Sequence, residues 1–185
     1  MTATPARASA DTSTSNGDAT SPGPSAGARN AGRLAAVQAL YQIDVTGAVP
    51  AEVIKDFLTG RTGGILMTED PDTAQESIQR AEELDSETFI GLVRTVETRG
   101  EDVDGMIKGA VSAEWPWERL ETTLRAILRA GVAELLTRTD VPAKVTVSEF
   151  IDIAHAFYAG PEPRMVNAVL DKVARALGRL EPRGA

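Results

Sequence analysis

Residues 120–136, with the sequence LETTLRAILRAGVAELL, decide the fold class of this 185-residue chain. Apolar side chains recur there every three or four residues, which is the spacing of one face of an α-helix. The apolar positions are Leu120, Leu124, Ile127, Leu128, Gly131 and Leu135, with Val132 and Leu136 at the edges. So broad an apolar face predicts a central helix over residues 118–138 that several neighbouring helices cover.

The same periodicity recurs on both sides of this segment. It predicts six further helices, over residues 33–45, 51–58, 85–99, 101–111, 146–157 and 164–177. Residues 60–80 are interpreted as a loop or a weakly structured insertion, with a hairpin that includes residues 63–67 as the minor alternative. No other segment offers a convincing strand, so the sequence predicts an all-α domain of about seven helices.

Several helix ends carry recognisable signals. Asp85 or Ser86 can cap the helix that follows it, and Gly100 is expected to end that helix. Thr146 and Glu149 have the spacing of a capping box, in which the two side chains satisfy free N–H groups of the first turn. The helix that they start is expected to bury Phe150 and Phe157 on one face.

The N-terminal segment differs from this body. Residues 1–28 contain no Val, Ile, Leu, Phe, Tyr or Trp. Without large apolar side chains to bury, this segment cannot offset the entropy lost when a backbone becomes ordered. The sequence predicts a disordered tail over residues 1–28 and one folded domain over residues 29–180. Arg29, Asn30 and Arg33 stand at the junction, either as a basic edge that reaches a polyanion or as ordinary solvated residues of a helix start.

Composition excludes several classes of function. The chain has no Cys and one His, so it can build neither a disulfide nor a multi-histidine metal site by itself. His155 is interpreted as an ordinary helix residue, and no catalytic or nucleotide-binding motif is present. A formal net charge of −8 repels nucleic acid, so RNA binding would need a local basic patch or a basic partner. These features favour a binding module over an enzyme.

The sequence contains neither a membrane-spanning apolar stretch nor the apolar core of a signal peptide. Together with the absence of Cys, this leads us to expect a cytoplasmic protein.

Three segments stand out together: RLAAVQALY at residues 33–41, VPAKVTVSE at residues 141–149 and PRMVNAVLDK at residues 163–172. In kind, order and spacing they resemble the NusB family of transcription antitermination factors, and the LRAILRA run at residues 124–130 fits as well. The resemblance covers about residues 29–178. It implies two small three-helix bundles that share a long central helix, with no catalysis and no cofactor.

The resemblance also implies a function. NusB-like proteins bind the boxA element of nascent, chiefly ribosomal, RNA as a heterodimer with NusE, a small-subunit ribosomal protein. The complex helps to assemble an antitermination complex on RNA polymerase. An acidic chain would pair readily with a basic ribosomal protein, so we expect weak RNA binding alone and stronger binding with NusE.

The resemblance also implies which residues form the RNA-binding and partner-binding sites, by matching positions of this sequence to the family motifs. The RNA-binding positions correspond to Arg29, Asn30, Arg33, Tyr41, Arg164, Met165 and Asn167. Tyr41 and Glu162 correspond to partner contacts, although Tyr41 fits a core position equally well and Asn167 fits a capping role. Asn30 and Met165 depart from the family, which often has a basic residue and a phenylalanine there. Replacing Arg33 by Ala is expected to weaken RNA binding without unfolding the chain.

Two other functions remain open at this point. Some ribosomal RNA cytosine methyltransferases carry a NusB-like domain before a catalytic domain, so the chain could correspond to a detached domain of that kind. The apolar faces could instead bury a homodimer interface in a helical adaptor that has no direct role with RNA.

Overall fold

The computed structural model describes residues 24–61, 66–69, 76–79 and 84–181. Within these ranges it contains six α-helices, one 3-10 turn and one β-hairpin. The elements in chain order are α1 (Ala26–Thr46), α2 (Pro50–Leu58), β1 (Leu66–Glu69), β2 (Glu76–Gln79), α3 (Ser86–Ala110), η2 (Trp117–Arg119), α4 (Thr122–Thr137), α5 (Ala143–Phe157) and α6 (Glu162–Ala176).

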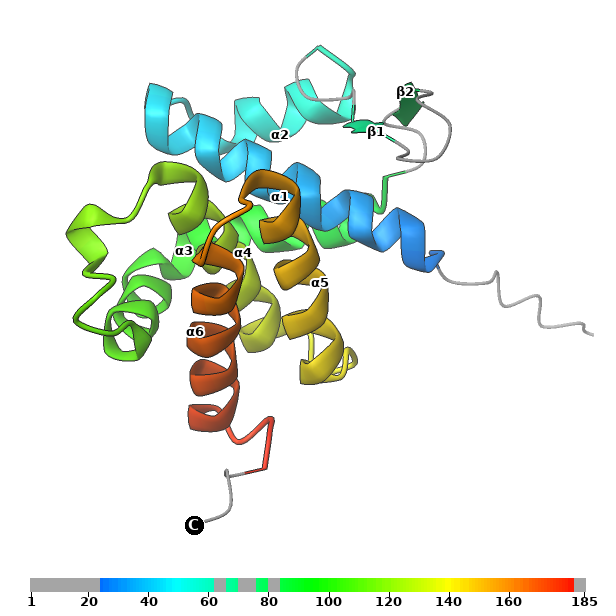
Figure 1. Cartoon of the computed structure of the whole chain (residues 1–185). Helices are drawn as coiled ribbons and strands as arrows, with labels where there is room; N and C mark the ends of the chain where they lie inside the picture. Colours follow the sequence, from blue (N-terminus) through cyan, green and yellow to red (C-terminus); the bar gives the residue numbers. More distant parts are fainter. Residues whose placement is uncertain (1–23, 62–65, 70–75, 80–83, 182–185) are drawn as a thin grey trace, which may run out of the picture.

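The helices form two groups of three, as the family resemblance implied. Helices α1, α2 and α3 pack against one another, and so do α4, α5 and α6. Helix α4 joins the groups because it also packs on α1 and α3 (Figure 1). Ten of its sixteen residues are buried, which explains the broad apolar face of residues 120–136. The expected central helix is therefore confirmed, although α3, not α4, is the longest helix of the described chain.

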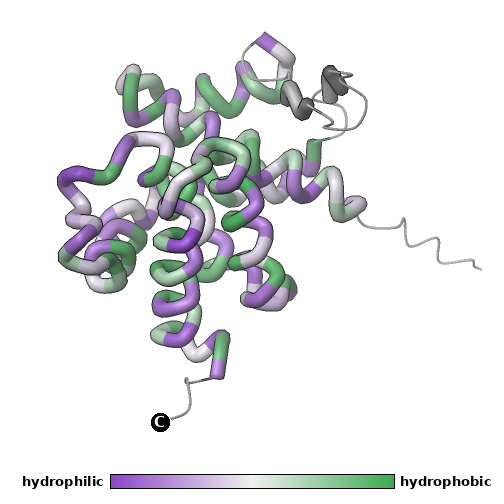
Figure 2. The backbone as a smooth tube through the Cα atoms, viewed as in Figure 1, coloured by the Kyte–Doolittle hydropathy of each residue, from purple (hydrophilic) through white to green (hydrophobic). Residues whose placement is uncertain are grey.

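Aliphatic side chains fill the core, and polar and apolar positions alternate along the helices that surround it (Figure 2). Phe57 of α2 stacks on Phe89 of α3 with ring centroids 5.4 Å apart. Gly131 lets α4 approach α6 closely, because a Cβ at this position would lie 2.9 Å from the methyl groups of Leu170. The packing thus depends on one small residue at the α4–α6 crossing.

Helix α1 begins earlier than the sequence indicated. It starts at Ala26, where the Ser25 hydroxyl accepts a hydrogen bond from the Ala28 backbone N–H. Asp85 N–H also donates to the Ala28 carbonyl, so the first turn is held by the loop before α3. The predicted tail over residues 1–28 is wrong at its end, because capping and tertiary contact order a segment without large apolar side chains. Residues 1–23 lie outside the described residues.

Helix α3 combines two helices that the sequence separated at Gly100. The backbone departs from helical angles only at Arg99 (φ −125°, ψ 26°), and the helix then continues to Ala110. Asp85 caps its start, as expected, by accepting from Glu87 and Thr88 N–H. The expected break is therefore present as a kink, one residue before Gly100. Because the two helices join there as α3, six helices replace the seven expected.

The expected capping box of α5 is absent from the described structure. The helix begins at Ala143, so Thr146 lies in its first turns and directs its hydroxyl into the core, where it donates to Glu134. Glu149 contacts Arg33 instead of Thr146. Tertiary contacts thus override a local capping pattern.

The expectation of a loop over residues 60–80 is wrong where β1 and β2 are described, and the alternative of a hairpin is found there instead; residues 63–65 of that alternative lie outside the described residues. The two strands are antiparallel, with Met67 opposite Ile78 and Thr68 opposite Ser77. The strands form a two-stranded sheet of their own beside the helices (Figure 1).

Candidate functional site

Arg33 lies at the junction of three helices. Its guanidinium donates two hydrogen bonds to Glu134 of α4, from Nε to Oε2 at 2.8 Å and from Nη2 to Oε1 at 2.7 Å. Nη1 contacts Glu149 of α5 at 3.4 Å, and the Thr146 hydroxyl donates to Glu134 Oε1 at 3.1 Å. The arginine that the resemblance assigned to RNA therefore ties α1, α4 and α5 together.

Both members of the main ion pair are buried, with 4% of the Arg33 side chain and 1% of the Glu134 side chain exposed. Burial opposes the charge of Arg33, but the hydrogen bonds and charges of Glu134, with the charge of Glu149, raise its pKa above the usual value. The guanidinium stays charged and engaged in the interior. Arg33 also lines the hollow that opens beside this network.

A hollow of about 210 Å³ opens beside this network, between the start of α1 and the turn from α4 to α5. Arg29, Asp140 and Pro142 are among the residues that line it. Arg29 is half-buried and Asn30 is exposed. The side chain of Arg29 forms no ion pair with any residue of the described chain, so its charge is available to a ligand.

A second hollow, of about 230 Å³, lies between α1, α4 and α5, and we call it the Tyr41 groove. Its lining residues are Val37, Gln38, Tyr41, Thr123 and Phe157. Tyr41 is 43% exposed and Phe157 is 45% exposed. The expectation that Phe157 is buried is wrong, because α5 ends there and its ring borders the groove. Two large exposed rings in one hollow are typical of a protein-binding surface.

An acidic rim, formed by Glu121 and Glu162, lies beside the Tyr41 groove around Tyr158. The Tyr158 hydroxyl donates to Glu121 Oε2 at 3.2 Å. Burial, the Glu121 bond and the charges of Glu121 and Glu162 raise the pKa of Tyr158 to about 12, while a hydrogen bond with Thr123 acts in the opposite direction. Thr123 also lines the groove, so Tyr158 and its partner Glu121 lie next to it.

The first turns of α6 carry the remaining candidate residues. Arg164 and Asn167 are exposed and lie three residues apart, on the same side of the helix. Met165 is only 6% exposed and belongs to the core, so its side chain is not presented to RNA. The Glu162 carboxylate folds over Gly160, where an added Cβ would lie 2.6 Å from Oε2.

The candidate residues do not form a single cluster. Arg29 and Tyr41 are twelve residues apart on α1, which corresponds to about 18 Å along a helix axis. The hollow beside Arg29 and the Tyr41 groove have no lining residue in common. Glu162 is brought to the groove through Tyr158, whereas Arg29 and Asn30 lie at the other end of α1.

Sequence reasoning missed five residues of the groove and its rim as site residues: Gln38, Glu121, Thr123, Phe157 and Tyr158. Gln38 belongs to the quoted RLAAVQALY segment, and its polar amide in an otherwise apolar stretch is a signal that could have found it. Phe157 and Tyr158 end α5 just before a Gly-Pro turn, where side chains leave the buried face. Glu121 carried no comparable signal, because it is one of many acidic residues.

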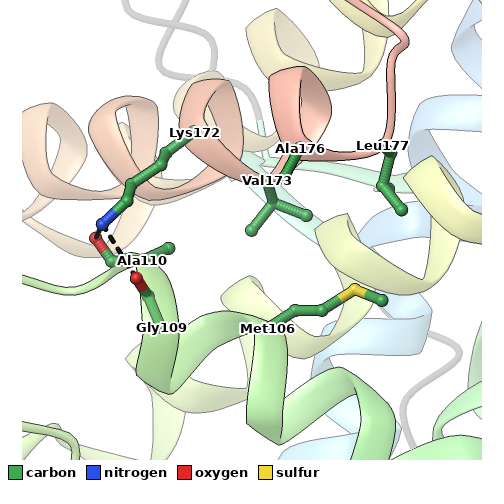
Figure 3. A pocket seen from close by; sticks show the side chains of 7 residues that line it. All are labelled: Met106, Gly109, Ala110, Lys172, Val173, Ala176 and Leu177. Atoms are coloured by element: carbon green, nitrogen blue, oxygen red, sulfur yellow. Dashed lines mark hydrogen bonds between the residues drawn. The ribbon is translucent and has the colours of Figure 1, made fainter.

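The largest of these hollows, about 290 Å³, lies between α3 and α6 (Figure 3). Aliphatic groups of Met106, Val173 and Leu177 line it. The Lys172 ammonium at its edge donates to the carbonyls of Gly109 and Ala110, at 2.8 and 3.5 Å. Lys172 therefore caps the C-terminal end of α3 and is already engaged.

Within the described ranges no group of three or more His, Asp or Glu side chains is placed to hold a metal ion. None of the described helices is both long enough and apolar enough to cross a bilayer.

The fold and these surfaces define an all-α binding protein with unpaired cations at helix starts and an apolar groove with an acidic rim. Residues 30–175 match the model of the NusB family. The chain belongs to the NusB family. This membership places it among transcription antitermination factors and not among enzymes.

Named relatives support the assignment. The chain is 48% identical over 153 residues to the transcription antitermination protein NusB of Rhodospirillum rubrum. The matched segment covers 80% of this chain and 83% of that protein. It is 45% identical over 156 residues to the NusB protein of Mesorhizobium japonicum, and the matched segment covers 84% of this chain and 94% of that protein.

Solved structures share the fold. NusB of T. maritima superposes with a TM-score of 0.61 at 24% identity and covers 80% of this chain and 90% of that one. A chain from the crystal structure of the antitermination factors NusB and NusE in complex with dsRNA superposes with a TM-score of 0.58 at 24% identity. That match covers 82% of this chain and 99% of that one.

Proposed function

We propose that this chain is a transcription antitermination factor that binds boxA RNA of nascent ribosomal transcripts as a heterodimer with NusE. The observation that carries the proposal is the identity of 45–48% with NusB antitermination proteins over at least four fifths of the chain. A solved structure with the same fold, that of NusB and NusE in complex with dsRNA, is consistent with the proposal. The heterodimer then helps to assemble an antitermination complex on RNA polymerase in the cytoplasm.

The Tyr41 groove and its acidic rim are the proposed surface for NusE. Exposed rings of Tyr41 and Phe157 supply apolar contact area, and such rings are enriched in protein interfaces. The carboxylates of Glu121 and Glu162 beside them favour a basic partner, as does the net charge of −8. Tyr41 and Glu162 thus keep the partner role that the family resemblance implies.

The proposed RNA contacts come from two helix starts. Arg29 closes the first turn of α1 and Asn30 follows it, and Arg164 and Asn167 lie in the first two turns of α6. Helix N-termini and unpaired arginines both attract phosphate groups. Arg33 and Met165 are buried, and we assign them to positioning these helices. These two separate pairs of exposed or half-buried side chains offer little basic surface each, which agrees with RNA binding that needs the basic partner.

The homodimeric adaptor is the second candidate, because the Tyr41 groove could bury a second copy of this chain. A detached domain of a methyltransferase has less support. The NusB relatives are matched over 83% and 94% of their own length, so they carry no large additional domain.

Size-exclusion chromatography with light scattering tests the proposal against the homodimer. We would mix the full chain with NusE from the same bacterium and measure the mass of the complex. A 1:1 heterodimer that replaces the free chain supports the proposal. A homodimer whose mass is unchanged when NusE is added contradicts it. Phe157→Ser should weaken the heterodimer, whereas Val45→Ser, at another exposed apolar position outside the groove lining, should leave it intact.

A further inference from the structure

Buried polar atoms almost always have hydrogen-bond partners in folded proteins. Among the buried side-chain nitrogen and oxygen atoms of the described chain, two lack one: Gln38 Oε1 and Arg125 Nε. The guanidinium of Arg125 is otherwise engaged, because its Nη2 donates to Asp44 and Thr122. Gln38 is different, since its amide makes no hydrogen bond with any residue that the structure describes.

Gln38 lines the Tyr41 groove together with Tyr41, Thr123 and Phe157. It lies on α1 between Val37 and Ala39, which are both buried in the core, and it borders the groove that α4 and α5 complete. An aliphatic side chain would fill this position without leaving an acceptor unpaired. An unpaired carbonyl oxygen beneath an apolar groove lowers the stability of the free protein, and a ligand that donates to it would remove that penalty.

We propose that Gln38 Oε1 accepts a hydrogen bond from a backbone N–H of an apolar segment of the basic protein partner, seated in the Tyr41 groove. This inference rests on the proposed function, since the partner is the protein that we assign to this groove. The terminal amide torsion of glutamine is broad, so a small rotation turns the oxygen toward an incoming donor.

Three features of the groove fit this occupant. The rings of Tyr41 and Phe157 offer apolar walls to side chains on either side of the donated N–H. Glu121 and Glu162 at the rim attract lysine or arginine residues that flank the apolar segment. A donor that pairs with Gln38 adds specificity, because a segment that binds without it leaves the acceptor buried and unpaired.

The test compares three chains for binding to NusE: the wild type, Gln38→Met and the matched control Gln42→Met. Methionine keeps the length and helix propensity of glutamine but removes the acceptor. Gln42 lies one turn further along α1 and does not line the groove. Isothermal titration calorimetry should show binding weakened by about 5- to 30-fold in Gln38→Met, and unchanged binding in Gln42→Met.

Thermal unfolding of the free chains provides the second readout. Loss of an unpaired acceptor predicts a Tm for Gln38→Met equal to or above that of the wild type. A lower Tm with unchanged affinity would make Gln38 a structural residue and overturn the inference. Gln38→Leu gives the same comparison with another side-chain shape if the Met variant folds poorly.

The two proposals can fail separately. If the wild type binds NusE and Gln38→Met binds within twofold of it, the role of Gln38 is wrong and the proposed function stands. If the wild type does not bind NusE, the proposed function fails, and the inference fails with it.

Discussion

Arg33 and Glu134 are 101 residues apart in sequence and form a two-pronged ion pair in the core, with N–O distances of 2.7 and 2.8 Å. The pair joins α1 of the first helix group to α4 of the second. The residue that the family resemblance connected with RNA is therefore part of the interior framework, and we propose that it acts on RNA binding by positioning α1.

Replacing Arg33 by Ala should destabilise the protein by about 3–5 kcal/mol, because the buried carboxylate of Glu134 would lose its counter-charge. Urea unfolding followed by circular dichroism measures the change. From the sequence we expected this variant to stay folded; the burial of the pair predicts that it does so with a clear loss of stability. A loss of less than 1 kcal/mol would show that the pair contributes little.

The double variant Arg33→Met with Glu134→Leu is the control for that prediction. It removes both charges together, so no unpaired charge remains in the core. We expect it to recover at least half of the stability lost in Arg33→Ala. A double variant that is less stable than Arg33→Ala would contradict the explanation by an unpaired charge.

Gly32→Ala should destabilise the protein by about 1–3 kcal/mol. An added Cβ would lie 2.8 Å from the Asp85 carbonyl oxygen, and backbone atoms cannot move aside cheaply. Gly27→Ala is the matched control on the same helix, where the nearest atom is 3.9 Å away. That substitution should be neutral or stabilising by up to about 1 kcal/mol. Equal unfolding midpoints in urea for both variants would be inconsistent with close packing at Gly32.

Tyr158 should titrate near pH 12, as its raised pKa indicates. The folded state holds the phenolic proton to a higher pH than the unfolded chain, whose tyrosines ionise near pH 10. The free energy of unfolding should therefore fall as the pH rises from about 10 to about 12.

The chain has two tyrosines, so a Tyr41→Phe background isolates the phenolate absorbance of Tyr158. Adding Glu121→Gln should lower the pKa of Tyr158, since Glu121 contributes both a hydrogen bond and a charge. Glu162→Gln should lower it less. An unchanged pKa in the Glu121 variant would remove Glu121 from the surroundings of Tyr158.

Arg164→Ala should weaken binding of boxA RNA by the complex with NusE and reduce the slope of log K against log salt by roughly 0.7, the value for one phosphate contact on a single strand. Arg94→Ala, at an exposed position of α3, is the control for loss of one positive charge. Equal affinities and slopes for the two variants would exclude Arg164 from the RNA surface.

Much of the helical fold could be predicted because its signals are local. The stripe of residues 120–136 predicted the buried α4, and Asp85 predicted the cap of α3. Two other local signals gave wrong predictions because distant residues outweighed them. The Thr146 hydroxyl donates to Glu134, and the start of α1 is held by a hydrogen bond from Asp85 N–H. The break expected at Gly100 appears as a kink at Arg99.

The candidate site was less predictable, because a sequence position does not show which way its side chain points. Arg33 and Arg164 both looked like basic residues near helix starts, yet only Arg164 is exposed. Phe157 looked like a core residue and instead borders the Tyr41 groove. The packing of α1, α4 and α5 brings Gln38, Glu121 and Tyr158 to this groove. A local sequence pattern does not contain that information.

A titration of fluorescent boxA RNA tests the central claim most directly. It would be carried out with the full chain alone, NusE alone and both together, at several salt concentrations, against an RNA of scrambled sequence. The account predicts weak binding by the chain alone and tighter, boxA-selective binding by the two proteins together. Binding that is equally weak and unselective in all three cases would contradict it.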